Sequence, residues 1–245
     1  MPRYDFRTPR VYVDAPLTVG HGVALDRDQA NYLIKVLRLK RGDNVLLFNG
    51  RDGEWRARLV GSGKRALDAE LTEQLREQPQ ATDLHFLFAP LKHARLDYLV
   101  QKAVEMGTSL LQPVITRHTQ VARVNVERMR ANTIEAAQQC GILSLPAVAA
   151  PVDFTNATAD GSRLLIFCDE RTDVQDPVAA LKAAPRGLPP SVLVGPEGGF
   201  AEEERAALLE RDYVVRIALG PRILRADTAA VAALALVQAV LGDWT

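Results

Sequence analysis

The stretch VLVGPEGGF, residues 192–200, runs a short apolar segment directly into a loop that holds three glycines and one carboxylate. The apolar segment predicts a buried strand, because it is too short to form a helix. The residues that follow, AEEERAALLE at 201–210, predict a helix with acidic residues in its first turn, where the helix dipole favours them. The glycine loop therefore lies between a strand end and a helix start, which is where open α/β sheets bind ligands.

The chain from residue 84 onward alternates in the same way. Strands are predicted within 84–90, 110–116, 163–170, 191–199 and 214–220, and helices within 93–107, 126–141 and from Asp227 on. Gly107 and Gly141 are expected to end two of the helices. Residues 179–191, rich in Ala and Pro, are expected to be a surface connection. This alternation predicts a mostly parallel sheet that is covered on both faces.

The first 76 residues have a different rhythm. One strand is predicted at 10–13, and Asp26 is predicted to cap a helix that continues to about Lys40. Further strands at 45–50, 54–60 and 66–73 are separated by glycine turns, which predicts a small β-barrel. We therefore expect domains at 1–76 and 80–245, joined by a polar linker. GSGKRA at 61–66 matches a dinucleotide-binding pattern, but the chain continues as a strand, which favours a simple turn.

The charges are divided unevenly although the net charge is zero. Residues 1–76 hold 14 Lys and Arg against 10 Asp and Glu, whereas the remaining 169 residues hold 16 against 20. The surplus favours contact between the first segment and phosphates, and the alternative is random scatter over a solvated surface.

Cysteine, histidine and hydropathy patterns argue against several other classes. Cys140 and Cys168 are expected to be reduced core thiols of a cytoplasmic protein. The four histidines have no ligand spacing, so we expect no catalytic metal. No signal peptide is visible, and the apolar run at 229–241 is too short to span a bilayer, which predicts no membrane association.

A second loop of the same kind follows the last predicted strand. In LGPRILRADTA, residues 219–229, Gly220 and Pro221 precede a helix that Asp227 or Thr228 is expected to open. Glycines let a ligand approach the backbone, and a carboxylate such as Glu197 repels phosphate, so the two loops suit a neutral or cationic small molecule. Arg222 and Arg225 suggest charge stabilisation or phosphate positioning. The alternative for residues 195–199 is a tight turn without a ligand.

These motifs together resemble the SPOUT class of S-adenosylmethionine-dependent RNA methyltransferases. GPEGGF and LGPRILRADTA, together with ANYLIKVLRLKRGD at 30–43, KHARLDYLVQKAVEMG at 92–107 and EAAQQCG at 135–141, are most similar to the RsmE family. That family methylates N3 of a uridine in 16S ribosomal RNA of the small (30S) subunit. The resemblance covers nearly the whole chain.

The resemblance implies a PUA-like RNA-binding domain at 1–76 and a methyltransferase domain with a C-terminal trefoil knot at 80–245. It also implies a homodimer and a bent S-adenosylmethionine molecule held largely by backbone groups. The cofactor-binding residues it implies are Gly195, Pro196, Glu197, Gly198, Gly199, Leu219, Gly220, Pro221, Ile223, Leu224, Arg225 and Thr228.

Two positions depart from the family's pattern. Ile142 stands soon after the EAAQQCG segment, where the family usually carries an arginine. RADT at 225–228 replaces the common Arg-Thr-Glu-Thr, so the carboxylate is one methylene shorter at Asp227. These departures put any RNA contact of that arginine, and the precise role of Asp227, in question.

The implied chemistry suggests roles for individual side chains. Uracil N3 is a poor nucleophile until it loses its proton, and Arg225 is the residue we expect to stabilise the resulting negative charge. Asp227 or Glu197 is expected to accept the proton, although either carboxylate could instead cap a helix. RNA contacts are expected from Arg3, Arg7, Arg10, Lys35, Arg38, Lys40, Arg41 and Arg222.

Three other functions fit parts of the sequence. The same fold could act on a transfer RNA or on 23S ribosomal RNA. A non-catalytic RNA-binding assembly factor could keep the loops for folding alone. A nicotinamide-dependent enzyme is disfavoured because the dinucleotide-binding fingerprint is missing.

Overall fold

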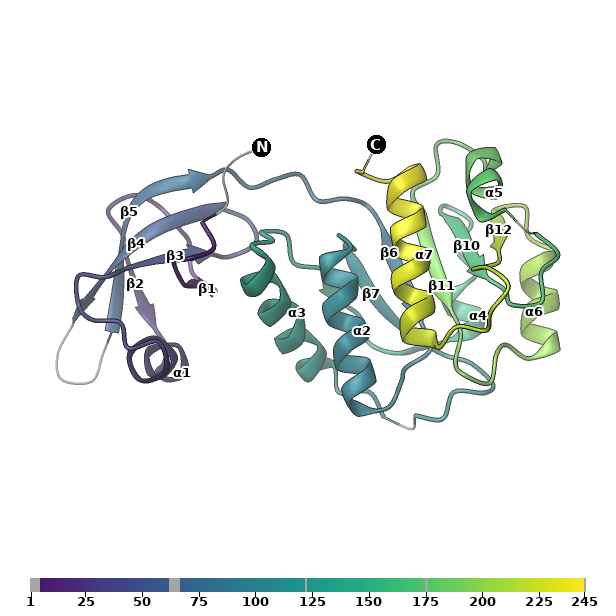
Figure 1. The fold of residues 1–245 in the computed structure, drawn as a ribbon, viewed down its shortest axis with the longest axis horizontal. Helices are drawn as coiled ribbons and strands as arrows, with labels where there is room; N and C mark the ends of the chain where they lie inside the picture. The colour runs from purple at the N-terminus through teal and green to yellow at the C-terminus, as the bar shows by residue number, and fades with distance from the viewer. Residues whose placement is uncertain (1–4, 62–66, 122, 175, 245) are drawn as a thin grey trace. The chain divides into compact units, whose positions relative to one another are not determined.

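The computed structural model describes residues 5–61, 67–121, 123–174 and 176–244 of the 245-residue chain. The chain divides into two compact units (Figure 1). The first comprises residues 1–80 and 137–145, and the second comprises 81–136 and 146–245. The sequence did not indicate that 137–145, the end of a helix and the loop after it, belongs with the first unit.

A five-stranded sheet forms the first unit, with strand order β1-β3-β4-β5-β2. The strands are β1 (Arg10–Tyr12), β2 (Gly22–Leu25), β3 (Asn44–Phe48), β4 (Glu54–Gly61) and β5 (Leu67–Arg76). The β3, β4, β5 and β2 neighbours pair antiparallel, whereas β1 pairs parallel with β3. Gly50 and Gly53 have positive φ angles between β3 and β4, as the predicted turns require. The strand β2 was not predicted.

The predicted helix of the first unit is shorter than expected. Asp26 caps α1 (Arg27–Asn31) and forms a capping box with Gln29, which confirms the predicted start. The chain then widens into a π-helical turn, η1 (Tyr32–Val36). Arg38, with φ of 58°, reverses the chain before Lys40, so the helix cannot reach the predicted end.

A parallel sheet forms the second unit, with strand order β12-β10-β11-β6-β7-β8 and with β9 paired to β7. The neighbouring strands of this sheet pair parallel, which confirms the predicted sheet type. The strands are β6 (His85–Phe88), β7 (Leu110–Ile115), β8 (Ala147–Val148), β9 (Val152–Asp153), β10 (Leu164–Cys168), β11 (Pro190–Val194) and β12 (Val214–Ile217).

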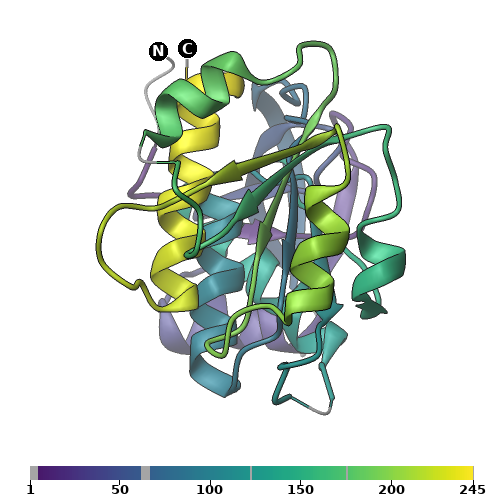
Figure 2. The same ribbon diagram turned by 90° about the vertical axis from the view of Figure 1, so that its right-hand side faces the viewer.

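Helices cover both faces of this sheet (Figures 1 and 2). On one face, α2 (His93–Glu105), α5 (Pro177–Ala183), α7 (Ala226–Leu241) and Met129 of α3 (Val126–Cys140) share a core with Val192 and Val194 of β11. On the other face, α4 (Phe154–Ala157) and α6 (Glu202–Leu209) pack around Leu193. The alternation along β11 shows a strand buried on both sides, as the sequence predicted.

Three local predictions need correction. Residues 177–183 form α5, opened by the N-cap Asp176 and a proline in its first turn, so the predicted connection is partly helical. Arg225 is the N-cap of α7, ahead of the predicted Asp227 or Thr228. Cys168 is buried as expected, and burial raises the pKa of its thiol to about 12, but Cys140 is exposed.

Other local predictions are confirmed. Gly107 and Gly141 follow α2 and α3 with positive φ angles, as expected of helix ends. Acidic residues fill the first turn of α6. Within the described residues, no helix combines the length and apolar character needed to cross a membrane.

Candidate active site

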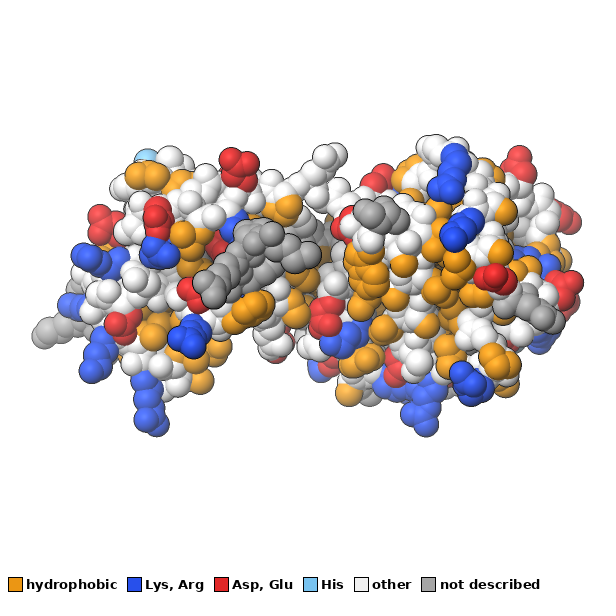
Figure 3. Space-filling view, turned by 45° about the horizontal axis from the view of Figure 1, so that its top comes forward, with side chains coloured by type: hydrophobic (Ala, Val, Ile, Leu, Met, Phe, Trp, Pro, Cys, Tyr) orange, Lys and Arg blue, Asp and Glu red, His pale blue; other side chains and the backbone are white. Residues whose placement is uncertain are grey.

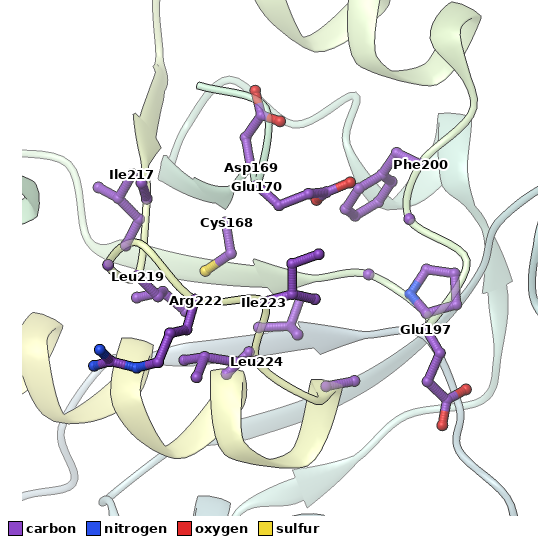
Figure 4. Close-up of a pocket in the computed structure, with 18 of the residues that line it drawn as sticks. Cys168, Asp169, Glu170, Glu197, Phe200, Ile217, Leu219, Arg222, Ile223 and Leu224 are labelled. Atoms are coloured by element: carbon purple, nitrogen blue, oxygen red, sulfur yellow. The ribbon is translucent and has the colours of Figure 1, made fainter. Parts of the chain in front are cut away.

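A cavity of about 300 Å³ opens at the carboxyl ends of three adjacent parallel strands, β10, β11 and β12 (Figure 4). Residues 195–200 after β11 form one wall, and residues 218–224 after β12 form another. The two Gly-Pro loops therefore meet, as the sequence predicted. The position is the edge at which open α/β sheets take ligands.

Most of the predicted cofactor-binding residues line this cavity. They are Gly195, Pro196, Glu197, Gly198, Gly199, Leu219, Gly220, Pro221, Ile223 and Leu224. Arg225 and Thr228 do not line it: both are exposed at the start of α7. Ala226 and Ala229 of α7 face the cavity instead.

The first Gly-Pro loop is held in a shape that depends on its glycines. A Cβ atom on Gly195 would lie 2.5 Å from a ring carbon of Phe200, and one on Gly199 would lie 2.7 Å from Glu170 Oε1. Gly199 also has φ of 69°, and its N–H donates to the carbonyl of Pro196 at 2.9 Å. Side chains at these positions would fill the space beside the cavity, so the wall is made of backbone.

The end of β10 adds carboxylates that the sequence analysis did not assign to the site. Asp169 is 2% exposed and pairs with Arg205 and Arg216, so it organises the structure beneath the cavity. Glu170 is exposed and extends across the cavity toward the Gly199 loop (Figure 4). The sequence signal was present, because Asp169 and Glu170 directly follow an apolar strand whose end meets the other two loops.

Arg95, near the start of α2, was also missed. Its Nε lies 3.1 Å from Oδ2 of Asp227, and its guanidinium forms a second ion pair with Glu197. The Arg95 side chain thus joins the first Gly-Pro loop to α7. In Figure 4 the carboxylate of Glu197 points away from the cavity. Its partner in the ion pair is the guanidinium of Arg95. The two predicted proton acceptors therefore converge on one arginine outside the cavity.

Arg222 and Arg225 are both exposed, and neither guanidinium forms an ion pair with any described residue. Arg222 belongs to the rim of the cavity, with its guanidinium directed away from the centre (Figure 4). Ile223 between them is 93% exposed. The segment after β12 therefore presents two available cations and one apolar side chain beside the cavity.

Most of the predicted RNA-binding residues of the first unit are exposed. Arg7, Lys35, Arg38 and Lys40 are exposed. Arg41 is exposed as well, with its guanidinium against Gly61. Figure 3 shows Lys and Arg side chains projecting from the visible face of this unit, with hydrophobic side chains between them. Arg3 lies outside the described residues.

Arg10 was predicted wrongly. Its side chain is 4% exposed and pairs with Glu54, which also pairs with Arg76. Its guanidinium additionally donates to the carbonyl of Gln138. A buried, paired guanidinium is a structural element of the first unit and does not face RNA.

The described residues contain no group of three or more His, Cys, Asp or Glu side chains placed to hold a metal ion. The carboxylates at the cavity are paired with arginines or stand alone.

Comparison with known proteins assigns the chain to a family. Residues 77–238 match the model of an RNA methyltransferase domain, and residues 25–72 match that of an RNA methyltransferase PUA domain. Ribosomal RNA small subunit methyltransferase E of Rickettsia conorii is 31% identical over 94% of both chains. The protein of the same name from Synechocystis is 32% identical over 89% of this chain and 73% of its own.

Solved structures agree with the sequence comparison. Ribosomal RNA small subunit methyltransferase E of Neisseria gonorrhoeae, bound to S-adenosyl methionine, superposes with a TM-score of 0.84 at 28% identity, covering 98% of this chain and 100% of its own. A putative methyltransferase of Legionella pneumophila, also with this cofactor, gives 0.79 at 26% identity over 95% and 98%. The chain belongs to the RNA methyltransferase family that includes ribosomal RNA small subunit methyltransferase E.

Proposed function

We propose that the protein transfers a methyl group from S-adenosylmethionine to N3 of a uridine in 16S ribosomal RNA. The observation that carries the proposal is the cavity that the two Gly-Pro loops form at the ends of three parallel strands. Support comes from similar solved structures that contain S-adenosylmethionine and from relatives named for the small ribosomal subunit.

The cavity fits the cofactor in shape and in chemistry. Its volume of about 300 Å³ lies at the lower end of the range for small-molecule sites. Leu219, Leu224 and Ala229 supply apolar contacts, and the glycine-lined wall supplies backbone groups. Glu170 places a carboxylate at the cavity, which suits a ligand that carries positive charge. These residues would hold the cofactor, which supplies an electrophilic methyl group when bound.

The residues around the cavity would position and activate the uracil. Arg225 is exposed and makes no ion pair with a described residue, so its guanidinium is available to stabilise charge on a deprotonated base. Glu197 and Asp227 both pair with Arg95, and one of these carboxylates would accept the N3 proton. Arg222 on the rim would contact an RNA phosphate. Holding the base in line with the methyl donor would provide most of the rate enhancement.

The target is proposed to be presented by the 30S subunit, with a homodimer as the active form and the cytoplasm as the compartment. The exposed cations Arg7, Lys35, Arg38, Lys40 and Arg41 would bind the RNA backbone, with Arg3 added from the sequence. We further propose domain functions of RNA binding for 1–76 and methyl transfer for 80–245. The trefoil knot in the C-terminal part stays a proposal, which tracing the chain in a crystal structure would test.

Two measurements, made one after the other, test the proposed function. Calorimetric titration with S-adenosylmethionine should give one site per chain, and absence of binding would favour the non-catalytic assembly factor. Primer extension on ribosomal RNA from cells with and without the protein should then give a stop only in its presence, because methylation at N3 blocks base pairing. A stop in 23S ribosomal RNA or in a transfer RNA would reassign the substrate.

A further inference from the structure

Three large hydrophobic side chains of η1 in the first unit are exposed. Tyr32 is 46% exposed, Ile34 40% and Val36 66%, whereas Leu33 between them is fully buried and anchors the turn in the core. Among the described residues, none forms a ring contact with Tyr32 or a hydrogen bond with its hydroxyl. We call Tyr32, Ile34 and Val36 the η1 patch.

The backbone that carries the η1 patch is unusual in two respects. The N–H of Leu37 donates to the carbonyl of Tyr32 at 3.0 Å, which closes a π-helical turn, and such turns occur frequently at functional sites. Directly after it, Arg38 has φ of 58° and is the one non-glycine with positive φ within the described residues. Glycine would adopt this conformation without penalty, so the arginine side chain is kept at a cost to stability.

Three cations lie within η1 or shortly after it in the sequence. Lys35, Arg38 and Lys40 are exposed, and none of them forms an ion pair with a described residue. The sequence has no acidic residue between Gln29 and Gly42. The next carboxylate, that of Asp43, accepts a hydrogen bond from the backbone N–H of Lys40 at 2.7 Å. Residues 32–40 therefore combine exposed apolar and aromatic side chains with exposed positive charges.

This composition fits single-stranded RNA better than a protein partner. Aromatic side chains stack on unpaired bases, and basic side chains follow the phosphates between them. Protein interfaces, in contrast, are depleted in lysine and have charged residues removed from their core. Duplex RNA presents phosphates but stacked bases, so it would leave the exposed ring of Tyr32 without a partner.

We propose that the η1 patch binds unpaired bases of the RNA substrate. The ring of Tyr32 stacks on one base, Ile34 and Val36 pack beside it, and Lys35, Arg38 and Lys40 contact the flanking phosphates. The inference rests on the proposed function in that RNA is the substrate. It adds that the RNA is single-stranded where the first unit holds it, which a strip of phosphate-binding cations alone does not require.

The test compares binding of the full-length chain to a fluorescent single-stranded oligoribonucleotide and to a duplex of equal length, over a series of salt concentrations and without cofactor. Tyr32→Ala should weaken single-strand binding roughly five- to a hundredfold, because a stacked base contributes that much, and should leave duplex binding unchanged. The salt dependence should stay the same, because no charge is removed. Tyr32→Phe keeps the ring and should stay within about twofold of the original chain.

Tyr98→Ala provides a matched control, because Tyr98 on α2 of the second unit is 44% exposed, nearly as much as Tyr32. Its ring also lies near a cation, with Lys102 Nζ 5.6 Å from the ring centroid. It should leave single-strand binding unaltered. Unchanged affinity in both Tyr32→Ala and Val36→Ser would overturn the proposal. Equal losses of affinity for single-stranded and duplex RNA would also overturn it. So would loss of a dimer in light scattering while RNA affinity stays intact, because the η1 patch would then be an interface between copies.

The same variants separate this inference from the proposed function. Tyr32→Ala should bind S-adenosylmethionine with unchanged affinity, because η1 belongs to the first unit and the cavity to the second. If the original chain failed to bind the cofactor, the methyltransferase proposal would fall while the RNA-binding result stood. If the cofactor bound and Tyr32→Ala had no effect on RNA, only the inference about the η1 patch would fall.

Discussion

The two units present their candidate binding groups in opposite ways. In the second unit, the cavity wall is backbone, made accessible by glycines whose missing side chains would collide with Phe200 and Glu170. In the first unit, the candidate surface consists of exposed side chains of η1 together with Lys35, Arg38 and Lys40, which form no ion pair with a described residue. One candidate site is built mainly from backbone, whereas the other is built from exposed side chains.

This difference explains what a substitution should do in each unit. A backbone-made site is disturbed by adding atoms, since a new side chain occupies the ligand's place or pushes its neighbours. A side-chain site is disturbed by removing atoms, and each cation removed takes away only its own phosphate contact. Adding a side chain at the cavity wall should therefore have a larger effect than removing one cation of the first unit, and the effects of removing several cations should add.

The largest change in stability is expected at the buried ion pair between Arg10 and Glu54. Glu54→Gln would leave Arg10, at 4% side-chain exposure, and Arg76, at 15%, without their buried carboxylate. Removing one partner of a buried ion pair costs about 3–5 kcal/mol in the free energy of unfolding. Urea denaturation followed by Trp55 fluorescence, in a Trp244→Phe background, reports the first unit because Trp55 lies in β4.

Glu73→Gln is the matched control, since Glu73 pairs with Arg56 at the surface of the same sheet and should change the free energy of unfolding by less than about 1 kcal/mol. A loss below about 1 kcal/mol in Glu54→Gln as well would return Arg10 to the candidate RNA surface.

The second effect tests the backbone-made wall of the cavity. A Cβ on Gly195 would lie 2.5 Å from the Phe200 ring, and overpacking of this kind costs about 1–3 kcal/mol. Gly195→Ala should therefore weaken S-adenosylmethionine binding roughly five- to a hundredfold by calorimetry. Gly22→Ala, at an open position of β2, should bind the cofactor normally. Equal affinities for the two variants would show that the first Gly-Pro loop does not form the site.

A smaller effect is expected at the bridge between the loop and α7. Arg95→Ala removes the pairs with Glu197 and Asp227, and each partly exposed pair contributes about 0.2–1 kcal/mol. We expect cofactor affinity to fall roughly two- to tenfold, because the loop loses its tie to α7. Arg128→Ala, which breaks the surface pair with Asp97 between α3 and α2, should leave the affinity alone. Tighter cofactor binding in Arg95→Ala would mean that the ion pairs of Arg95 restrict entry to the cavity instead of shaping it.

The smallest effect belongs to single cations of the first unit. Lys35→Ala should flatten the logarithmic dependence of RNA affinity on salt by about 0.7–0.9, as one lost phosphate contact predicts, and adding Lys40→Ala should flatten it again by the same amount. Lys182→Ala, exposed on α5 of the second unit, serves as the control. An unaltered slope in both first-unit variants would remove these lysines from the RNA surface.

The sequence located the glycine loops that line the cavity better than it predicted the surroundings of individual basic side chains. Gly195, Gly199 and Gly220 could be placed because glycine loops at strand ends serve few other purposes, and parallel strands bring those ends together. Arg10 and Lys35 look alike in a sequence, yet one is buried against Glu54 and the other is exposed. Only the pairing of distant strands decides which arginine meets a buried carboxylate.

The other differences between the predicted and the observed structure have three causes: a long-range contact, a local chain reversal and the shortness of two strands. Arg95 stands 102 residues before Glu197 and 132 before Asp227, so no local pattern could join them. The shortened helix after Asp26 has a local cause. The apolar spacing predicts a helix to about Lys40, but the left-handed conformation of Arg38 ends it earlier. The short strands β8 and β9 have two residues each, below the length at which alternation gives a signal.

The most direct test of the central claim is a calorimetric titration of the original chain with S-adenosylmethionine. The account predicts one site per chain, and it predicts that Gly195→Ala weakens that site while Gly22→Ala does not. A titration without heat from the original chain, together with a crystal structure in which the cavity between Gly198 and Gly220 holds no cofactor after soaking, would show that the two loops do not form the site.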